Sequence, residues 1–184
     1  GAASDAAPTL AADEQATEGG SRVDRGPGAS LWLGLSALLV GLDQASKLLL
    51  EAAIPRNARV NVLPGFDLTM RYNTGAAFSF LAGQPGWQRW FFAGIAVLVS
   101  GVLIHLLRQE PERCRASIAL TLILGGAIGN CIDRVFYGHV IDFLLFYWRH
   151  HYWPAFNVAD AAISCGIVLY GLDACLRSDH EKSS

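Results

Sequence analysis

Four long apolar segments constrain this chain more than any other feature of its sequence. They cover residues 31–50, 90–107, 116–132 and 158–176, with polar stretches between them. A helix rises about 1.5 Å per residue, so a segment the length of 90–107 spans roughly 27 Å, close to the roughly 30 Å hydrocarbon core of a bilayer. The chain is 52% hydrophobic and only 16% charged, whereas soluble domains average about 25% charged residues. We therefore predict a mainly α membrane protein with four transmembrane helices.

The four segments predict one membrane domain over residues 31–177, flanked by two tails. Residues 1–30 are rich in Ala, Gly, Asp and Glu, which predicts a disordered N-terminal tail rather than a signal peptide, because no apolar run precedes a cleavage site. Residues 178–184 are predicted to form a C-terminal tail. Four helices place both termini on one side of the membrane. Three arginines crowd the short connection 108–116, so the positive-inside rule favours termini in the cytoplasm.

The two remaining connections then lie outside the cytoplasm, and each has its own pattern. Apolar and polar residues alternate over 66–72 after a Pro64-Gly65 turn signal, and this period of two is typical of a half-buried strand. We predict a small β-sheet over about 57–82 that lies on the membrane, since an open sheet edge is not tolerated within lipid. The segment 137–153 is crowded with aromatic rings, which favour the headgroup region.

Three carboxylates near the ends of the last two apolar segments are the candidates for chemistry: Asp133, Asp142 and Asp160. Charged groups at the edge of hydrocarbon are costly, so they are usually paired or functional. If Asp142 and Asp160 converge, two like charges about 3 Å apart cannot both ionise, and one acid keeps its proton. Such a pair is a general base and a general acid at once, and it can hydrolyse a peptide bond without a metal or a covalent intermediate.

Structural roles compete with this interpretation for each acid. Asp160 is equally well explained as a helix N-cap, where the unsatisfied amides and the helix dipole favour a carboxylate. Asp142 has an alternative as the ion-pair partner of Arg134 or of a histidine. Asp133 is adjacent to Arg134 in the sequence, which favours a structural ion pair or a helix-end anchor over a catalytic role.

Other polar residues have similarly plain alternatives. Asp43 and Lys47 are four residues apart, so they share one helical face and are best explained as a structural pair. Asn130 and Asn157 fit cap or network roles, and Asn73 begins an ordinary turn signal. The sequence contains no HExxH motif, no CxxC motif, no G-x-S-x-G elbow and no glycine-rich phosphate loop. We therefore expect no metal and no cofactor.

Five short strings, in order along the chain, together resemble one family. They are DQxxK at 43–47, RYNTGAAF at 71–78, GGAxGNxxDR at 125–134, HVxDF at 139–143 and FNxAD at 156–160. Each string alone is weak evidence, but five in order are strong. Over roughly residues 40–175 the chain resembles the bacterial lipoprotein signal peptidases, also called signal peptidase II.

This resemblance implies an aspartic-type endopeptidase of the bacterial inner membrane, with its active site toward the periplasm. Such an enzyme removes the signal peptide from a prolipoprotein whose cysteine carries a diacylglyceryl group, and it cuts on the N-terminal side of that cysteine. The resemblance assigns Asp142 and Asp160 as the catalytic dyad. It also assigns five positions that bind substrate or line the site: Asn130, Arg134, Asn157, Asn73 and Asp43. It further implies a periplasmic sheet cradle, a short periplasmic helix at about 140–150, and inhibition by cyclic peptide antibiotics that wedge between the two aspartates.

Two other classes of protein fit parts of the pattern. A transporter would place its acids at the membrane midplane within paired, interrupted helices, whereas these acids cluster toward one side. A non-enzymatic assembly protein would tolerate single Asp→Asn changes. The net charge of −2 gives no reason to expect nucleic acid. The expected partners are lipidated prolipoproteins and membrane lipid, with the chain acting as a monomer.

Overall fold

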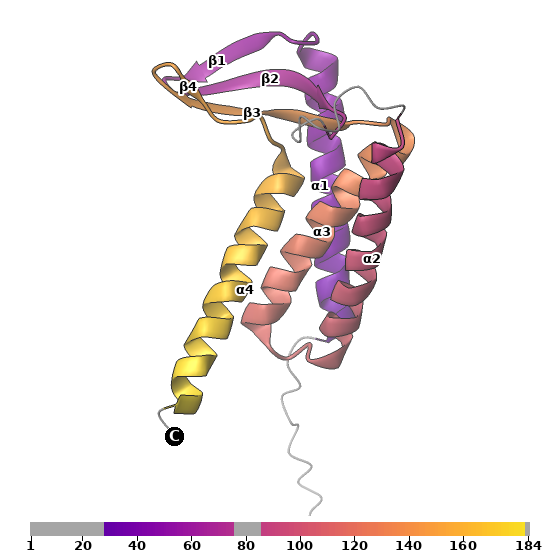
Figure 1. Ribbon diagram of the computed structural model, residues 1–184, viewed down its shortest axis with the longest axis vertical. Coiled ribbons are helices and arrows are strands. Elements are labelled where there is room, and N and C mark those ends of the chain that lie inside the picture. The colour runs from indigo at the N-terminus through magenta and orange to yellow at the C-terminus, as the bar shows by residue number, and fades with distance from the viewer. Residues whose placement is uncertain (1–27, 76–85, 183–184) are drawn as a thin grey trace, which may run out of the picture.

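The computed structural model describes residues 28–75 and 86–182. Its four helices are α1 (Ala29–Ala53), α2 (Gln88–Gln109), α3 (Cys114–Phe136) and α4 (Val158–Lys182), shown in Figure 1. Within the described residues, these four helices are long and apolar enough to cross a membrane. The predicted spans are thus confirmed. Helix α4 runs past the predicted domain boundary at residue 177, and residues 1–27 of the predicted N-terminal tail lie outside the described residues.

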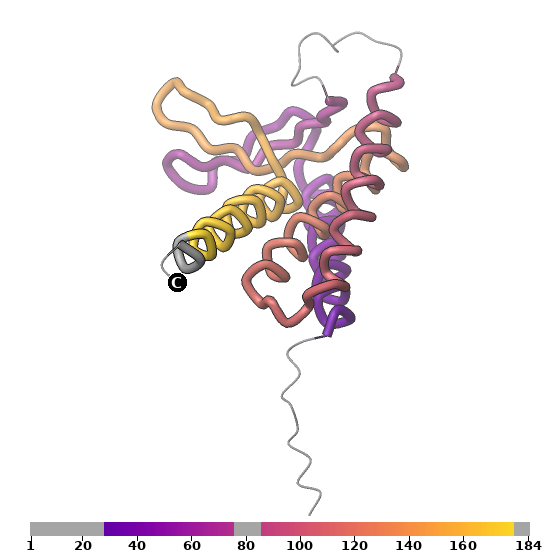
Figure 2. Tube along the Cα trace, turned by 60° about the horizontal axis from the view of Figure 1, so that its bottom comes forward, coloured from indigo at the N-terminus to yellow at the C-terminus, as the bar shows by residue number. Residues whose placement is uncertain are grey.

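Helix α3 is the centre of the bundle. Helices α1, α2 and α4 all pack against it, and it is by far the most buried of the four spans. The sheet lies across one end of the bundle, where α1 ends and α4 begins (Figure 1), and its turns project on the side of α4 (Figure 2). Helix α1 begins and α4 ends at the opposite end (Figure 1). Polar residues near the sheet end of each helix are therefore gathered into one region.

Glycines allow α3 to approach its neighbours closely. A Cβ atom on Gly126 would lie 2.4 Å from the backbone oxygen of Ala159, and one on Gly129 would lie 2.6 Å from a carboxylate oxygen of Asp43. On α4, a Cβ atom on Gly166 would lie 2.7 Å from the backbone oxygen of Ala119. Small residues at such contacts let helix backbones meet within a membrane. The start of α4 is thereby held directly against α3.

The sheet is antiparallel, with strand order β1-β2-β3-β4. Its strands are β1 (Arg59–Leu63), β2 (Phe66–Asn73), β3 (Val140–Trp148) and β4 (His151–Tyr152). The predicted hairpin of β1 and β2 is confirmed, with its turn at Gly65, whose φ of 90° favours glycine. The predicted sheet segment 57–82 includes residues 76–82, which lie outside the described residues.

The segment 137–153 corrects one expectation. A short helix was expected at about 140–150, but residues 140–148 form β3, and β4 follows at once. Strand β3 pairs with β2 through Tyr72 opposite Ile141 and Asn73 opposite Val140. The β-branched and aromatic side chains of this segment suit a pleated surface. Pairing with β2 gives the backbone N–H and C=O groups of β3 hydrogen-bond partners.

The joint between α1 and the sheet is a small apolar cluster of Ile54, Met70 and Ile141, each no more than 6% exposed. An irregularity in the register between Leu68 and Arg71 breaks the predicted alternation of β2, so that Thr69 and Met70 are both buried although they are neighbours. Ile141 lies within this cluster, and its position fixes the start of β3.

Replacing Gly126 with alanine should separate α4 from α3 and destabilise the protein by about 1–3 kcal/mol, because the added Cβ overlaps backbone rather than a flexible side chain. Thermal unfolding of the detergent-solubilised protein measures the loss. Gly101→Ala is the matched control, since a Cβ atom there would have nothing within 4 Å. Equal unfolding temperatures for the two variants would contradict the close approach of α3 and α4.

Candidate active site

Asp142 and Asp160 come together at the junction of the sheet and α4. Asp142 is the third residue of β3, and Asp160 is in the first turn of α4. Asn157 bonds to both: its Nδ2 donates to Asp142 Oδ1 at 2.9 Å, and its Oδ1 accepts from the backbone N–H of Asp160 at 2.9 Å. One asparagine therefore links the two acids directly.

The same asparagine begins α4. The backbone N–H of Asn157 donates to Asp160 Oδ2 at 3.3 Å, which together with the Asn157 Oδ1 contact makes a reciprocal capping box. The cap role considered for Asp160 is thus real, but Asn157 is the N-cap residue. Capping uses only one carboxylate oxygen of Asp160, and the other remains for a different partner.

Two further asparagines donate to the remaining oxygens of the acids. Asn130 Nδ2 donates to Asp160 Oδ1 at 2.7 Å, and Asn73 Nδ2 donates to Asp142 Oδ2 at 3.1 Å. Asn157 Nδ2 donates to Asp142 Oδ1, and the Asn157 backbone N–H donates to Asp160 Oδ2. Each of the four carboxyl oxygens therefore accepts one N–H. Both acids are therefore held in fixed orientations by groups that carry no charge.

Asp142 holds a proton more tightly than an ordinary aspartate does. Its side chain is only 3% exposed. Burial, and next the charge of Asp160, raise the pKa of Asp142 from 3.8 to about 7, against the opposing effects of Asn73, Lys47 and Asn157. Near neutral pH the arrangement thus offers one neutral carboxyl group beside a second acid, as general acid–base chemistry requires.

Asp142 opens onto a cavity of about 700 Å³ along the sheet, large enough for several residues of an extended peptide. Residues from all four strands, from the end of β2 and from the segment that precedes α4 line it: Arg59, Arg71, Tyr72, Asn73, Thr74, Asp142, Leu145, Tyr152, Trp153, Pro154 and Ala155. Its lining is both polar and aromatic. The carboxyl group of Asp142 therefore faces a space in which a peptide bond and a water molecule fit.

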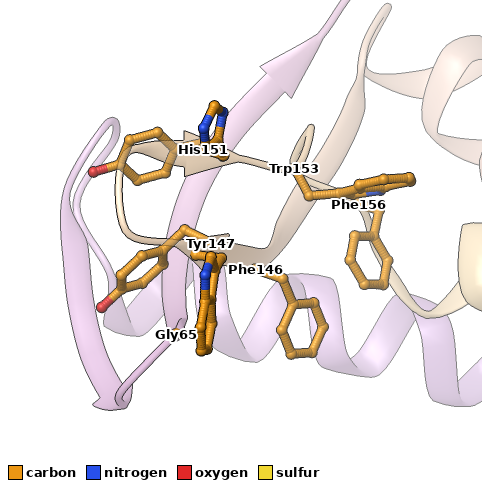
Figure 3. A pocket seen from close by; sticks show the side chains of 8 residues that line it. Gly65, Phe146, Tyr147, His151, Trp153 and Phe156 are labelled. Carbon is orange, nitrogen blue, oxygen red and sulfur yellow. The ribbon is translucent and has the colours of Figure 1, made fainter.

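A second, more apolar pocket of about 480 Å³ lies farther along the sheet (Figure 3). Aromatic side chains around the β3–β4 turn form most of it, and Phe146 stacks on Phe66 and Phe156 with ring centroids 4.9 Å and 5.8 Å apart. Trp148 and Trp153 near it are 75% and 68% exposed. Neither acid lines this pocket. Because its walls are mostly aromatic, the pocket is an apolar contact surface.

A buried cluster of charges lies beneath the two acids. Lys47 Nζ is 2.6 Å from Asp43 Oδ2 and 2.8 Å from Asp133 Oδ2, and all three residues are at most 1% exposed. Asp43 Oδ1 accepts the backbone N–H of Ala159 at 3.0 Å, and Asp133 Oδ2 accepts that of Ile141 at 3.2 Å. The cluster thus binds the residue directly before each acid of the dyad.

Arg134 brings a positive charge to the same region from α3. Its Nη1 donates to the backbone oxygen of Asn130 at 3.1 Å, and its guanidinium lies over the ring of Phe92, 5.3 Å from the centroid. Its charge interacts with those of Asp142 and Asp160. Arg134 therefore contributes a positive charge to the region of the two acids.

The sequence matches the family model described as signal peptidase (SPase) II over residues 35–176. The chain belongs to the signal peptidase II family. It is 50% identical over 153 residues to a lipoprotein signal peptidase of Tolumonas auensis, which covers 82% of this chain and 93% of that protein. It is 52% identical to a lipoprotein signal peptidase of Pseudomonas putida, over 79% of this chain and 87% of that protein. A solved bacterial membrane enzyme is 26% identical with a TM-score of 0.70, covering 79% of this chain and 92% of that chain.

Within this signal peptidase II chain, the structure gathers every residue that the sequence assigned to the site. Asn73 and Asn157 contact Asp142, Asn130 contacts Asp160, Arg134 is bonded to Asn130, and Asp43 binds the start of α4.

One expected pair is wrong, and two polar residues were undervalued. Asp133 pairs with Lys47 rather than with its sequence neighbour Arg134, whose side chain leaves α3 in a different direction. Gln44 was given no role, yet its Nε2 donates to Asp133 Oδ1 at 2.8 Å. The predicted Asp43–Lys47 pair is present, and Asp133 is a second partner of Lys47. The available signal was that Asp43, Gln44 and Lys47 are strongly polar residues within one apolar segment.

Replacing Asp142 with asparagine should make the unfolding free energy less dependent on pH. Because the folded pKa of Asp142 is about 7 rather than 3.8, the folded state binds this proton more tightly. The contribution of Asp142 to the stability of the wild-type protein is then fully present below the unfolded pKa of 3.8, and it is lost as the pH rises toward 7. The variant should gain, relative to wild type, on the order of 4 kcal/mol between pH 4 and pH 8, measured by unfolding in detergent.

Asp67→Asn is the control with the opposite sign. Arg59 and Asn61 lower the pKa of Asp67, so its contribution is present above its ordinary pKa and is lost as pH falls. The Asp67 variant should therefore lose stability relative to wild type at pH 8 and approach it at acid pH. A constant difference between wild type and Asp142→Asn at every pH would disprove the raised pKa of Asp142.

Proposed function

We propose that this chain is a membrane aspartic endopeptidase that removes signal peptides from diacylglyceryl-modified prolipoproteins, cutting on the N-terminal side of the lipidated cysteine. The observation that carries the proposal is the junction of Asp142 and Asp160, linked by Asn157 beside a cavity, in a chain of the signal peptidase II family. The acids lie at one end of the bundle, not at its midplane (Figure 1), which favours a peptidase over a transporter.

In the proposed reaction, Asp160 is the carboxylate and Asp142 holds the proton. Asp160 takes a proton from water as the water oxygen bonds to the scissile carbonyl carbon, while Asp142 donates its proton to the carbonyl oxygen. The resulting tetrahedral diol collapses when the C–N bond breaks: the leaving nitrogen takes a proton from Asp160, and Asp142 recovers one from a hydroxyl group. This cycle balances without a metal or a covalent intermediate.

A lipidated substrate explains why the site is placed at the end of membrane helices. Withdrawing acyl chains from a bilayer costs about 0.8 kcal/mol per CH₂ group, so such a substrate stays in the membrane. The enzyme must therefore bring its acids and water to the bilayer surface. The start of α4 and the sheet above it supply both a carboxylate and a polar cavity at that depth.

We further propose that the sheet end of the bundle faces the periplasm and that both termini are cytoplasmic, in the bacterial inner membrane. Arg108, Arg113 and Arg115 surround the α2–α3 connection at the opposite end, as the positive-inside rule requires of the cytoplasmic side. The aromatic pocket in Figure 3 and the exposed Trp148 and Trp153 fit the outer headgroup region, where indole rings concentrate.

Two further proposals follow from the family resemblance. Cyclic peptide antibiotics are proposed to inhibit the enzyme by entering between Asp142 and Asp160 from the cavity that Asp142 lines. The enzyme is proposed to act as a monomer within lipid, since one chain supplies both acids and every hydrogen bond to them that is described above.

Replacing either Asp142 or Asp160 with asparagine should reduce cleavage of lipidated precursor by at least about 100-fold, because each variant removes one proton-transfer group. The cleavage rate is measured with purified protein and a lipidated prolipoprotein as the substrate. Asp133→Asn is the control: asparagine keeps an oxygen that can accept the Ile141 N–H but lacks the charge that pairs with Lys47, so cleavage should persist at lower thermal stability. An inactive, folded Asp133 variant together with an active Asp142 variant would refute the dyad.

The proposed orientation can be tested with single cysteines in a chain whose four natural cysteines are replaced by serine. His150→Cys, at the exposed β3–β4 turn, should react with a membrane-impermeant maleimide in intact spheroplasts. Arg115→Cys, at the start of α3, should react only after lysis. Labelling of Arg115→Cys before lysis, with His150→Cys protected, would reverse the orientation.

A further inference from the structure

Lys47 contacts neither acid of the dyad, yet it is connected to one of them. Its side chain is 1% exposed, and its three ammonium hydrogens have three acceptors: Asp43 Oδ2 at 2.6 Å, Asp133 Oδ2 at 2.8 Å and Asn130 Oδ1 at 3.2 Å. The first two contacts form a buried ion cluster. The third leaves that cluster and reaches a residue that touches Asp160.

The contact with Lys47 determines which way the Asn130 amide points. Asn130 Oδ1 faces Lys47 Nζ and Asn157 Nδ2, which both donate, and Asn130 Nδ2 faces Asp160 Oδ1 at 2.7 Å. A lysine ammonium has donors and no acceptor. Turning the amide around would set its NH₂ group against two donors and its oxygen against a carboxylate, which is strongly unfavourable.

The other two asparagines of the site are oriented differently. Asn73 Oδ1 accepts the backbone N–H of Gly75 at 2.9 Å, and Asn157 Oδ1 accepts the backbone N–H of Asp160 at 2.9 Å. Each of these amides is therefore fixed by its own turn or helix cap. Asn130 is fixed by side chains from elsewhere in the fold, and the charged one is Lys47 on α1.

We propose that Lys47 is a positioning residue for peptide hydrolysis: through Asn130 it keeps an amide N–H on Asp160, and so keeps Asp160 as the carboxylate that takes a proton from water. This inference rests on the proposed function of the dyad. The link runs across three elements, from α1 through α3 to α4, and it explains why a fully buried lysine lies beneath a site that it does not touch.

Several other charges also act near Asp160 and must be separated from this effect. They come from every element that surrounds it: Asp142 on β3, Arg134 and Asp133 on α3, and Asp43 and Lys47 on α1. Removing Lys47 alone would change both the amide orientation and the local charge. A test must therefore keep the net charge of the cluster constant.

The double variant Lys47→Met/Asp133→Asn meets this condition. The wild-type cluster of Asp43, Lys47 and Asp133 has a formal net charge of −1. The double variant removes one charge of each sign, and with them the Lys47 donor to Asn130 Oδ1, so that Asn157 Nδ2 is the donor that remains. The readout is the acid limb of the pH profile of kcat/KM, where activity falls because the water-activating carboxylate becomes protonated. The limb should move about one pH unit higher, as expected for loss of a hydrogen bond to a charged group.

Matched variants separate charge from orientation. Asp133→Asn alone keeps Lys47 on Asn130 and should not raise the acid limb, although it lowers the unfolding temperature. Asn130→Ala removes the same N–H without changing any charge, so it should raise the limb as much as the double variant does. Combining Asn130→Ala with the double variant should add nothing to the shift, because Lys47→Met and Asn130→Ala act on the same N–H contact with Asp160.

Two results would overturn the role of Lys47. The first is a double variant that unfolds more easily but keeps the wild-type acid limb, which would make Lys47 purely structural. The second is an unshifted limb in Asn130→Ala, which needs no change at Lys47 and remains informative if the Lys47 variants fail to fold. Failure of the proposed dyad looks different: Asp142→Asn and Asp160→Asn would then cleave at the wild-type rate.

Discussion

The buried contact of one lysine with two carboxylates is the interaction on which this site depends. Charges without solvent are costly unless they are paired and hydrogen-bonded, and removing one partner of such a pair costs about 3–5 kcal/mol. Here the pairing also orders the backbone, because Asp43 binds the N–H of Ala159 and Asp133 binds the N–H of Ile141. The residues that follow these two are Asp160 and Asp142. A cluster that cannot rearrange cheaply thus sets the distance between two separate elements of the fold.

Neutral amide side chains complete the hydrogen-bonded network around the two acids. Asparagine side chains from β2, α3 and the start of α4 direct their NH₂ groups at the acids, so the carboxyl groups are oriented without a salt bridge that would fix both in the charged form. This distinction matters chemically, because an acid–base pair needs one member to keep a proton. Burial and the second acid raise the pKa of Asp142 to about 7 in spite of its two amide donors.

The parts of the molecule that local pattern determines could be predicted from sequence. Apolar length gave the four spans, and alternation across Pro64-Gly65 gave the β1–β2 hairpin. The family strings named the residues that the structure gathers around Asp142 and Asp160. Strand β3 was missed because the helix expected at about 140–150 came from the family resemblance, and the mostly apolar run there has no period that separates strand from helix. The Lys47–Asp133 pair was missed because it joins residues on different helices, while the adjacent Arg134 offered a nearer but incorrect partner.

The hydrogen-bonded network around the acids draws on α1, α3, β2, β3 and the start of α4. Asp160 belongs to the last of these to leave the ribosome. A nascent chain that has inserted only its first three spans carries Lys47, Asn130 and Asp142 but has no second acid. The proposed dyad is therefore incomplete until the final span has been synthesised, so hydrolysis at this site requires all four spans.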